Sequence, residues 1–252
     1  MRTSILSACL AASVLTLAFG PGAQSALAQA QDAAQQQEPK WEKSASLGLT
    51  LTRGNSDTLL FTGNVLASKK VAPHEFNLGA DATYGETEDV KNAESLHGFG
   101  QYNRLFGQRW FGYGRVEALH DDVADVDYRV ILSPGAGYYF IQRTNTTLRG
   151  EAGPAFIYEK LGGETKGYMT LRLAERFDYR FNERVKLWQT LEFLPQVDRF
   201  EKYIINAELG VETSLTKKLS LRTFVQDFYH SEPARGREKN DVKLVTAIAY
   251  RF

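Results

Sequence analysis

Apolar and polar residues alternate with a period of two along most of the chain between Trp41 and Phe252. Successive side chains of a β-strand point to opposite faces of a sheet, so this pattern predicts strands with one apolar and one polar face. No segment shows the 3.6-residue period of an amphipathic helix. The chain is therefore expected to be all-β. The alternation is clearest in segments 45–51, 76–84, 203–211 and 242–252.

Turn-forming residues divide this region into twelve predicted strands. The strands are 41–52, 58–70, 75–86, 93–106, 110–120, 128–141, 146–158, 166–181, 185–196, 202–215, 219–230 and 240–252. Six longer, charged links alternate with five short ones, which places the long links at one end of the sheet and both termini at the other. The long links are 53–57, 87–92, 121–127, 159–165, 197–201 and 231–239. An even number of strands with this asymmetry is typical of an outer-membrane β-barrel.

A membrane location requires the predicted sheet to close on itself. Hydrocarbon offers no hydrogen-bond partner to a free strand edge, so only a closed barrel can span it with strands. A helical span is excluded after residue 30, because the longest stretch without Asp, Glu, Lys or Arg is Val130 to Gln142, and a span needs about 20 apolar residues. The chain carries 30 basic and 30 acidic residues, which gives no general attraction to nucleic acid.

Aromatic residues, which make up 12% of the chain, gather near the strand ends on the apolar face. Two such girdles are expected where a barrel meets the two membrane surfaces. An aromatic-rich soluble sandwich is the alternative, although sandwiches rarely alternate long and short links so regularly. The girdle residues are Phe106, Tyr138, Phe140, Tyr179, Phe181, Tyr250 and Phe252 at the short-link end, and Tyr84, Tyr128, Phe156, Tyr158 and Tyr203 at the other.

The first 30 residues have the features of a secretory signal peptide. Arg2 precedes an apolar run over 5–19, and Ala28-Gln29-Ala30 forms a small-residue cleavage site. We expect a mature chain that begins with a polar, disordered lead-in over 31–40, followed by the barrel over 41–252. Cys9, the only cysteine, would be removed with the signal peptide, which excludes disulfides and thiolate chemistry from the mature protein. Lipidation of Cys9 is disfavoured because almost no apolar segment precedes it.

Several motifs resemble those of a known family. The chain ends in an alternating strand over 247–252, and its terminal Phe252 resembles the assembly signal of bacterial outer-membrane barrels. Segments 52–58, 133–138 and 173–176 are similar to those of the salt-induced outer membrane protein family, whose function is unknown. The resemblance implies an outer-membrane β-barrel of a Gram-negative bacterium, and it supplies no catalytic residue, ligand or mechanism.

The polar faces of the predicted strands place eight basic and seven acidic residues inside the barrel. A selective pore would have a ring of one charge sign, whereas this balance predicts cross-strand ion pairs in a barrel of intermediate width. A narrow hydrated path for ions or small solutes is the alternative. The inward residues are Arg115, Arg129, Arg149, Arg172, Arg176, Lys186, Arg222 and Lys243, with Asp81, Glu117, Glu151, Asp178, Glu192, Glu208 and Glu212.

Two strands do not follow the alternation cleanly. Glu175 falls on the lipid face in the middle of its strand, where a charge is costly, so either a bulge lies near Ala174 or the alternation fails there. In strand 110–120 the facing is ambiguous, since Phe111 and Tyr113 oppose Trp110 and Val116.

Residues with reactive side chains form no recognisable catalytic or metal-binding set. A lipid hydrolase would need a Ser–His pair with an orienting group facing lipid, but His97 faces the lumen beside Ser95 with no evident orienting residue. The four carboxylates of 121–127 suit a divalent cation by type but lack an EF-hand spacing, so a solvated acidic loop is expected. The remaining histidines, His74, His120 and His230, are expected to be ordinary residues near strand ends.

We therefore predict a non-enzymatic integral outer-membrane barrel, a structural or stress-related envelope component with a largely plugged lumen. A narrow channel is the main alternative, and an outer-membrane lipid hydrolase is the weaker one. No catalytic, cofactor-binding or metal-binding residue is predicted. The expected partners are outer-membrane lipid, lipopolysaccharide near the basic loop 235–239, and the barrel assembly machinery through the C-terminal strand.

Overall fold

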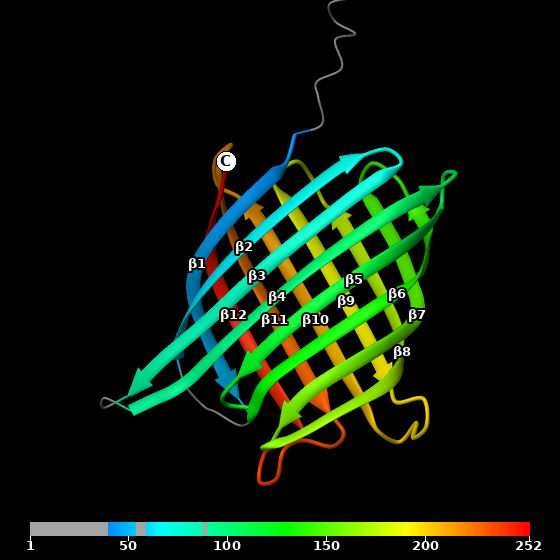
Figure 1. Cartoon of the computed structure of the whole chain (residues 1–252). Coiled ribbons are helices and arrows are strands. Elements are labelled where there is room, and N and C mark those ends of the chain that lie inside the picture. Colours follow the sequence, from blue (N-terminus) through cyan, green and yellow to red (C-terminus); the bar gives the residue numbers. More distant parts are fainter. Residues whose placement is uncertain (1–39, 54–58, 88–89) are drawn as a thin grey trace, which may run out of the picture. The chain divides into compact units, whose positions relative to one another are not determined.

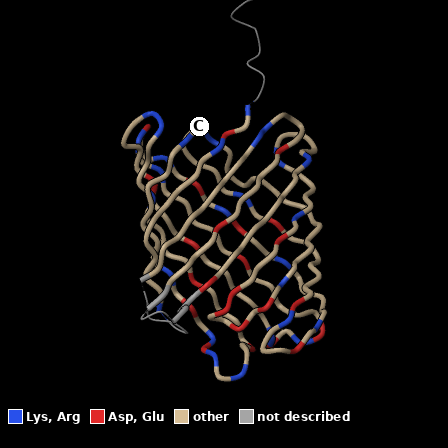
Figure 2. Tube along the Cα trace, turned by 60° about the vertical axis from the view of Figure 1, so that its left-hand side comes forward, with Lys and Arg blue, Asp and Glu red and all other residues tan. Residues whose placement is uncertain are grey.

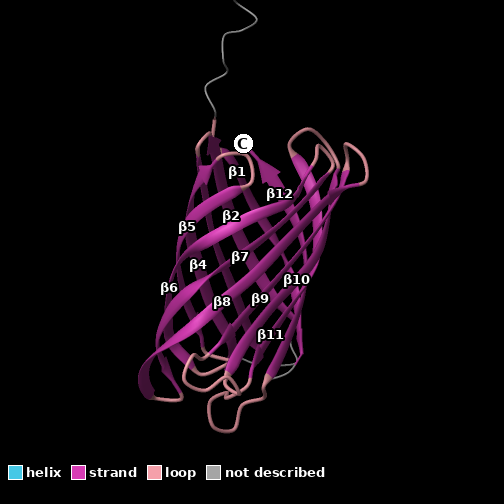
Figure 3. Ribbon diagram, turned by 90° about the vertical axis from the view of Figure 1, so that its right-hand side faces the viewer, coloured by secondary structure: helices cyan, strands magenta, loops and turns pink. Residues whose placement is uncertain are grey.

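The computed structural model describes residues 40–53, 59–87 and 90–252, which form twelve antiparallel strands closed into one barrel (Figure 1). The predicted signal peptide and most of the lead-in lie outside these residues. The strands are β1 Glu42–Arg53, β2 Leu59–Val71, β3 His74–Thr87, β4 Val90–Phe106, β5 Trp110–Asp121, β6 Val126–Gln142, β7 Thr146–Leu161, β8 Glu164–Arg180, β9 Val185–Pro195, β10 Tyr203–Ser214, β11 Leu219–His230 and β12 Asn240–Arg251. In this part of the chain no helix is long or apolar enough to cross a membrane (Figure 3).

The first and last strands complete the closure. β1 pairs with β12 from Ser44↔Arg251 to Arg53↔Val242, and the backbone N–H of Phe252 donates to the carbonyl of Lys43 at 3.2 Å. Each strand therefore has a hydrogen-bonding neighbour on both sides. Twelve strands were predicted in these positions, and the all-β barrel replaces the soluble sandwich that was the alternative.

Large apolar side chains cover the outside of the barrel. Leu47 is 77% exposed and Phe61 is 72% exposed, which a soluble protein would not repeat strand after strand. Lipid is the solvent that such an outer face requires. The exposed residues come from all parts of the barrel and include Leu49, Leu51, Val65, Leu78, Leu96, Val116, Leu132, Leu191, Leu209, Val225, Leu244 and Ile248.

The predicted aromatic girdles lie on this outer face. Near the end with the short turns, Tyr138 lies between Trp110 and Phe140, at ring distances of 4.8 and 5.2 Å. Near the opposite end, the rings of Tyr128 and Tyr158 lie 5.9 Å apart, and Tyr203 stacks on Tyr229 at 5.6 Å. We call the first end the turn end and the second the loop end.

Two links at the loop end are reduced to two residues each, much shorter than predicted. β7 continues to Leu161 and β8 begins at Glu164, so the expected loop 159–165 is a two-residue turn in which Gly162 and Gly163 both have positive φ. β3 and β4 likewise extend to Thr87 and from Val90, which replaces most of the expected loop 87–92. Polar residues on both faces suggested loops there, but strands that extend beyond the lipid can carry polar residues on both faces.

The structure shows which way the side chains of the two irregular strands face. In β5, Phe111 and Tyr113 face inward and are buried, while Trp110 and Val116 face outward. In β8 the pairing with β7 runs without a shift past Gly150↔Glu175, so there is no bulge near Ala174 and Glu175 stays on the outer face. Along β8, Glu175 lies four residues from Tyr179 of the turn-end girdle.

Candidate channel lumen and loop-end mouth

The interior of the barrel is packed with side chains over much of its length. Nine of the ten largest side chains with less than 2% exposure lie on the inner faces of the strands, and the tenth, Pro195, ends β9. A water-filled channel would leave inward side chains accessible instead. The nine are Phe111, Leu60, Ile157, Leu194, Glu159, Asn103, Thr50, Thr170 and Ser133.

An aromatic cluster fills the lumen near the turn end. Phe111, Tyr113 and Tyr139 are all buried and pack together, with the rings of Phe111 and Tyr139 5.2 Å apart. Glycines on the neighbouring strand make room for them: a Cβ on Gly137 would lie 2.1 Å from the Phe111 ring, and one on Gly135 would lie 2.5 Å from the Tyr113 hydroxyl. The ambiguity of β5 therefore arises from aromatic residues that are buried inside.

A buried charge network crosses the middle of the lumen around Arg172. Its Nε donates to Glu192 Oε1 at 2.5 Å and its Nη1 donates to Glu151 Oε2 at 2.8 Å. Gln101 donates to the other oxygen of Glu151 at 3.0 Å. The Arg172 and Glu151 side chains are only 6% and 5% exposed, so both charges depend on one another rather than on water.

His97 belongs to a second group of inward charges. Its Nδ1 lies 3.0 Å from Asp81 Oδ1 and its Nε2 lies 3.2 Å from Glu117 Oε1, while Arg115 pairs with Glu117 at 2.6 Å. The expectation that no group orients His97 was wrong, because Asp81 and Glu117 come from the two neighbouring strands, far from it in sequence. His97 faces the lumen as predicted, which keeps it from the lipid that a hydrolase of this type would attack.

The remaining predicted inward charges also have polar partners. Near the turn end, Asp178 pairs with Arg176 and Lys186, each at 2.8 Å. Figure 2 shows both charge signs distributed along the wall rather than gathered into a ring of one sign. The other contacts are Arg149–Glu151 at 3.5 Å, Arg222–Glu212 at 3.1 Å, Lys243–Asp121 at 3.4 Å, Arg129–Glu159 at 2.5 Å, and Glu208 with Trp188 and Gln226.

An apolar cluster narrows the lumen near the loop end. Ile131, Ala155, Ile157, Leu194 and Ile204 project inward from β6, β7, β9 and β10 and bury one another. Beside this cluster, the fully buried Glu159 accepts hydrogen bonds from Arg129 at 2.5 Å and from the Tyr168 hydroxyl at 2.9 Å. Sequence reasoning missed Glu159 because it lies in a segment that was expected to be a loop.

The link between β11 and β12, residues 231–239, reaches across the loop-end mouth. Ala234 is buried against Val126 at the start of β6 and Leu161 at the end of β7. Arg237 adds a long contact of 3.5 Å from its guanidinium to the carbonyl of Asp122. A loop from one side of the barrel therefore rests on turns that belong to the other side.

The acidic segment 121–127 spreads its carboxylates among separate partners. Asp121 accepts from the backbone N–H groups of Val123 and Ala124, both at 3.0 Å, besides its contact with Lys243. Asp122 lies 3.1 Å from His120, and Asp127 lies 2.6 Å from Lys160. In the described part of the chain no three His, Cys, Asp or Glu side chains come together as a metal site.

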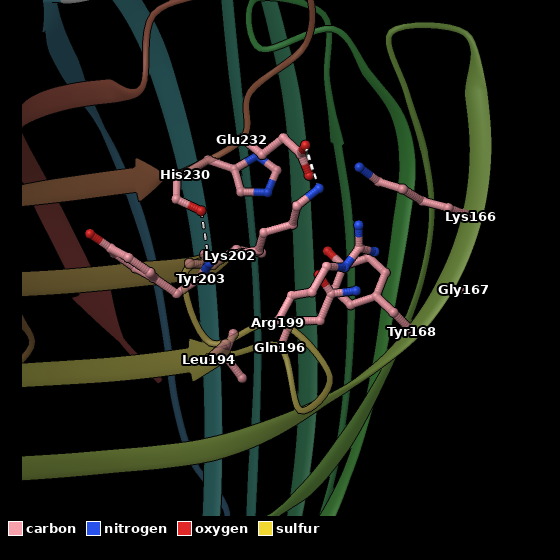
Figure 4. Close-up of a pocket in the computed structure, with 12 residues that line it drawn as sticks. Lys166, Gly167, Tyr168, Leu194, Gln196, Arg199, Lys202, Tyr203, His230 and Glu232 are labelled. Carbon is pink, nitrogen blue, oxygen red and sulfur yellow. Dashed lines mark hydrogen bonds and ion pairs between the residues drawn. The ribbon is translucent and has the colours of Figure 1, made fainter.

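A small pocket of about 80 Å³ opens at the loop end between β8, the link 196–202 and the start of the link 231–239 (Figure 4). Lys202 donates to Glu232 at 2.5 Å, and the backbone N–H of Tyr203 donates to Ser231 Oγ at 2.7 Å. The Lys202 ammonium lowers the pKa of the Glu232 carboxyl below its ordinary value. The lining residues are Lys166, Gly167, Tyr168, Leu194, Gln196, Arg199, Lys202, Tyr203, Ile204, His230, Ser231 and Glu232.

Comparison with solved structures confirms the fold class. The NanC porin is 6% identical with a TM-score of 0.58, and the match covers 82% of this chain and 100% of that one. The translocator domain of the autotransporter NalP from Neisseria meningitidis is 12% identical with a TM-score of 0.51, covering 92% and 95% of the two chains. At these identities the likeness concerns the fold alone.

The sequence comparisons give a family but no activity. Residues 45–252 match the model of a family described as "Protein of unknown function, DUF481". No protein of curated function matches the chain in sequence.

Proposed function

Because the chain belongs to the DUF481 family, whose function is unknown, its role has to be inferred from the barrel itself, and we propose a non-enzymatic envelope protein with a closed lumen. The fold and the apolar outer face indicate a location in the outer membrane of a Gram-negative bacterium. In such barrels the short turns face the periplasm and the longer loops face outward, which assigns the loop end to the cell exterior. A structural or stress-related role in the envelope is part of this proposal.

The observation that supports a closed lumen best is the burial of inward side chains at several depths. Phe111 near the turn end, Arg172 and Glu151 in the middle, and Ile157 near the loop end are all almost inaccessible to solvent. Dry ion pairs and apolar clusters both oppose the passage of a hydrated ion, because the ion would have to lose its water without equivalent ligands.

A narrow ion path is the second candidate, and it is favoured by a different set of inward residues. The side chains of Asp81 and His97 are 31% and 26% exposed, and those of Asp178 and Lys186 are 21% and 35% exposed. Water therefore reaches part of the polar face at two depths. A path along these groups would be lined by both charge signs and would select weakly between cations and anions.

Conductance of the purified, refolded protein in a planar bilayer tests the proposal. We expect no stepwise current, or only rare openings much smaller than those of a general porin measured in the same bilayer. A large steady conductance would refute the closed lumen, and weak ion selectivity in that current would support the narrow path. Refolding is checked separately by the heat-dependent shift in gel migration.

We further propose that the barrel assembly machinery recognises β12 and its terminal Phe252. The backbone of Phe252 is tied to Lys43 and its ring, 63% exposed, lies beside Tyr250 at the turn end. An exposed aromatic ring at the end of the closing strand is available to a partner before closure. Lipopolysaccharide is the expected lipid neighbour of the loop end.

A further inference from the structure

The barrel wall has a notch at its loop end, between β8 and β9. Regular pairing of these strands stops at Leu173↔Phe193, and beyond it there are only the bridge Thr170↔Gln196 and the bond from the Val197 N–H to the Met169 carbonyl. β8 nevertheless continues to Glu164, paired with β7 alone. At the level of 164–168, the described part of the chain supplies no strand on the other side of β8.

The small pocket at the loop end, which we call the mouth pocket, lies in this notch and reaches both faces of the barrel wall. Tyr168 and Ile204 contribute from the inner face, while Gly167 belongs to the outward set of β8. Tyr203 begins β10 at the pocket edge, and its ring is part of the outer loop-end girdle with Phe193 and Tyr229. Aromatic girdles mark the depth of lipid headgroups, so the pocket opens at that depth.

The charged side chains in the pocket lining are mostly basic. Lys166, Arg199 and Lys202 supply three positive charges, against one carboxylate, Glu232, which pairs with Lys202. Figure 4 shows that the three basic residues come from two different segments, β8 and the link 196–202.

Carboxylates outside the lining do not remove this excess of positive charge. Lys166 lies 3.5 Å from Glu159, but Glu159 already pairs with Arg129 at the shorter distance of 2.5 Å. Arg199 lies 3.5 Å from Asp198, whose side chain is 68% exposed and therefore strongly screened by water. With these neighbours included, there are four basic groups and three carboxylates at the pocket. The basic groups are Lys166, Arg199, Lys202 and Arg129, and the carboxylates are Glu232, Glu159 and Asp198.

We propose that this pocket binds a phosphate group of a lipopolysaccharide molecule in the outer leaflet. The proposal rests on the orientation of the barrel given above, but not on whether the lumen conducts. Lysine and arginine form strong charge-assisted hydrogen bonds with phosphate oxygens. The position of the pocket at the depth of the aromatic girdle favours a lipid-borne phosphate over a free one.

The test compares two variants of the full mature barrel that lose the same number of positive charges. In the first, Lys166→Gln, Arg199→Gln and Lys202→Gln remove the basic lining. In the control, Arg143→Gln, Arg184→Gln and Lys217→Gln remove three exposed basic residues of the turn end, none of which lines the pocket. Each protein is refolded in vesicles that contain lipopolysaccharide and extracted in mild detergent, and bound lipopolysaccharide is counted by native mass spectrometry.

We expect the pocket variant to retain about tenfold less lipopolysaccharide than the parent, because it loses the charge-assisted hydrogen bonds to the phosphate. The control should retain nearly as much as the parent. Glu232→Gln, which frees Lys202, should retain more than the parent. Equal losses in the pocket variant and the control, or no loss in either, would overturn the proposal. If the triple pocket variant does not fold, Lys202→Gln and Glu232→Gln must still move retention in opposite directions.

Titration with inorganic phosphate separates the two sources of the anion. We expect free phosphate to bind weakly and to leave the retained lipopolysaccharide in place at millimolar concentration. Tight binding of free phosphate by a parent protein that retains no lipopolysaccharide would overturn the lipid assignment. A conducting barrel that still retains lipopolysaccharide through the pocket would refute the closed lumen and leave this proposal intact.

Discussion

At the scale of single residues, the lumen is closed by contacts between inward aromatic rings and glycines on adjacent strands. Phe111 covers Gly137, and the ring of Trp188 lies over Gly210, where a Cβ would come within 2.3 Å of it. These glycines have ordinary extended backbones, so the space they leave, and not their conformational freedom, is what the fold uses. Packing of this kind tolerates little added volume.

The substitution Gly137→Ala is expected to lower the free energy of unfolding by about 1–3 kcal/mol, the usual cost of overpacking a filled interior. The new methyl group would overlap the buried Phe111 ring, which is held by Tyr139. Gly114→Ala is the matched control, because a Cβ at Gly114 meets nothing within 4 Å. Urea unfolding in lipid vesicles measures both, and equal stability of the two variants would contradict the contact.

Loss of the Glu151 carboxylate is expected to be far more costly than loss of an exposed one. Glu151→Ala leaves Arg172 with one partner in a dry site, for which a loss of about 3 kcal/mol is expected. Arg149→Ala should cost less, since Arg149 lies 3.5 Å from Glu151 and its Nε makes no hydrogen bond. Asp127→Ala, which breaks an exposed pair with Lys160, should cost about 0–1 kcal/mol.

The same unfolding measurement distinguishes the two models of the lumen. If water filled the middle of the barrel, Glu151→Ala and Asp127→Ala would have similarly small effects, because water would solvate the remaining charge. Bilayer recordings of Glu151→Ala complete the test: a dry network predicts lower stability, whereas a pore lining predicts altered ion selectivity with unchanged stability.

At the scale of elements, two segments complete the barrel: the link 231–239 over the mouth, and β12 at the seam. The link is held by Ala234, which packs against the ends of β6 and β7. The seam is held by the full antiparallel register between β1 and β12. The first contact involves few side chains, and the second is a complete backbone ladder.

Ala234→Asp is expected to release the link 231–239, because the new carboxylate would be buried among Val126 and Leu161 without a partner. Trypsin should then cleave after Arg235, Arg237 or Lys239 at least several-fold faster than in the parent protein. Thr144→Asp, at an exposed turn position on the opposite end, serves as the control. Unchanged cleavage in Ala234→Asp would show that Ala234 does not hold the link.

Deletion of Phe252 is expected to reduce insertion into the outer membrane far more than deletion of any one residue of 31–40. The Phe252 ring is largely exposed, so the protein that does insert should melt close to the parent temperature. Yield in outer-membrane fractions and heat-dependent gel migration measure the two effects. Equal yields for both kinds of deletion would show that Phe252 is not recognised during assembly.

At the scale of the whole molecule, the barrel inverts the arrangement of a soluble protein, with an apolar outside and a polar, ion-paired inside. The inside is not a simple core, however, because apolar clusters lie at both ends and charge networks lie between them. This layered filling makes closure a property of the whole lumen. Opening any single group of contacts should leave the others in place.

Labelling of single cysteines tests the orientation of the whole barrel. Removal of Cys9 with the signal peptide after Ala30 would leave a mature chain with no cysteine, so introduced thiols give a clean signal. We expect Arg235→Cys to react with a membrane-impermeant maleimide on intact cells, and Thr144→Cys to react only after the cells are opened. The reverse pattern would invert the proposed orientation. N-terminal sequencing of the purified protein checks the expected start at Gln31.

Much of the architecture could be read from the sequence because strand formation in lipid depends on a local pattern. Alternation along each segment sets which side chains face lipid, and this was sufficient for twelve strands, the two aromatic girdles and fifteen inward charges. The alternation is lost where strands leave the lipid. Around Gly162, polar residues on both faces removed the pattern, and with it the inward position of Glu159.

Contacts across the lumen were decided only by the tertiary structure. The sequence determined that Arg172, Glu151 and Glu192 face inward, but their meeting depends on the register between strands, which no local pattern encodes. The partners of His97, the aromatic cluster around Phe111 and the basic mouth pocket arose in the same way. The physical reason is that the side of the sheet a residue faces alternates every residue along one strand, so a local pattern reveals it. Which side chains meet inside the barrel depends instead on how the twelve strands are staggered when the sheet closes.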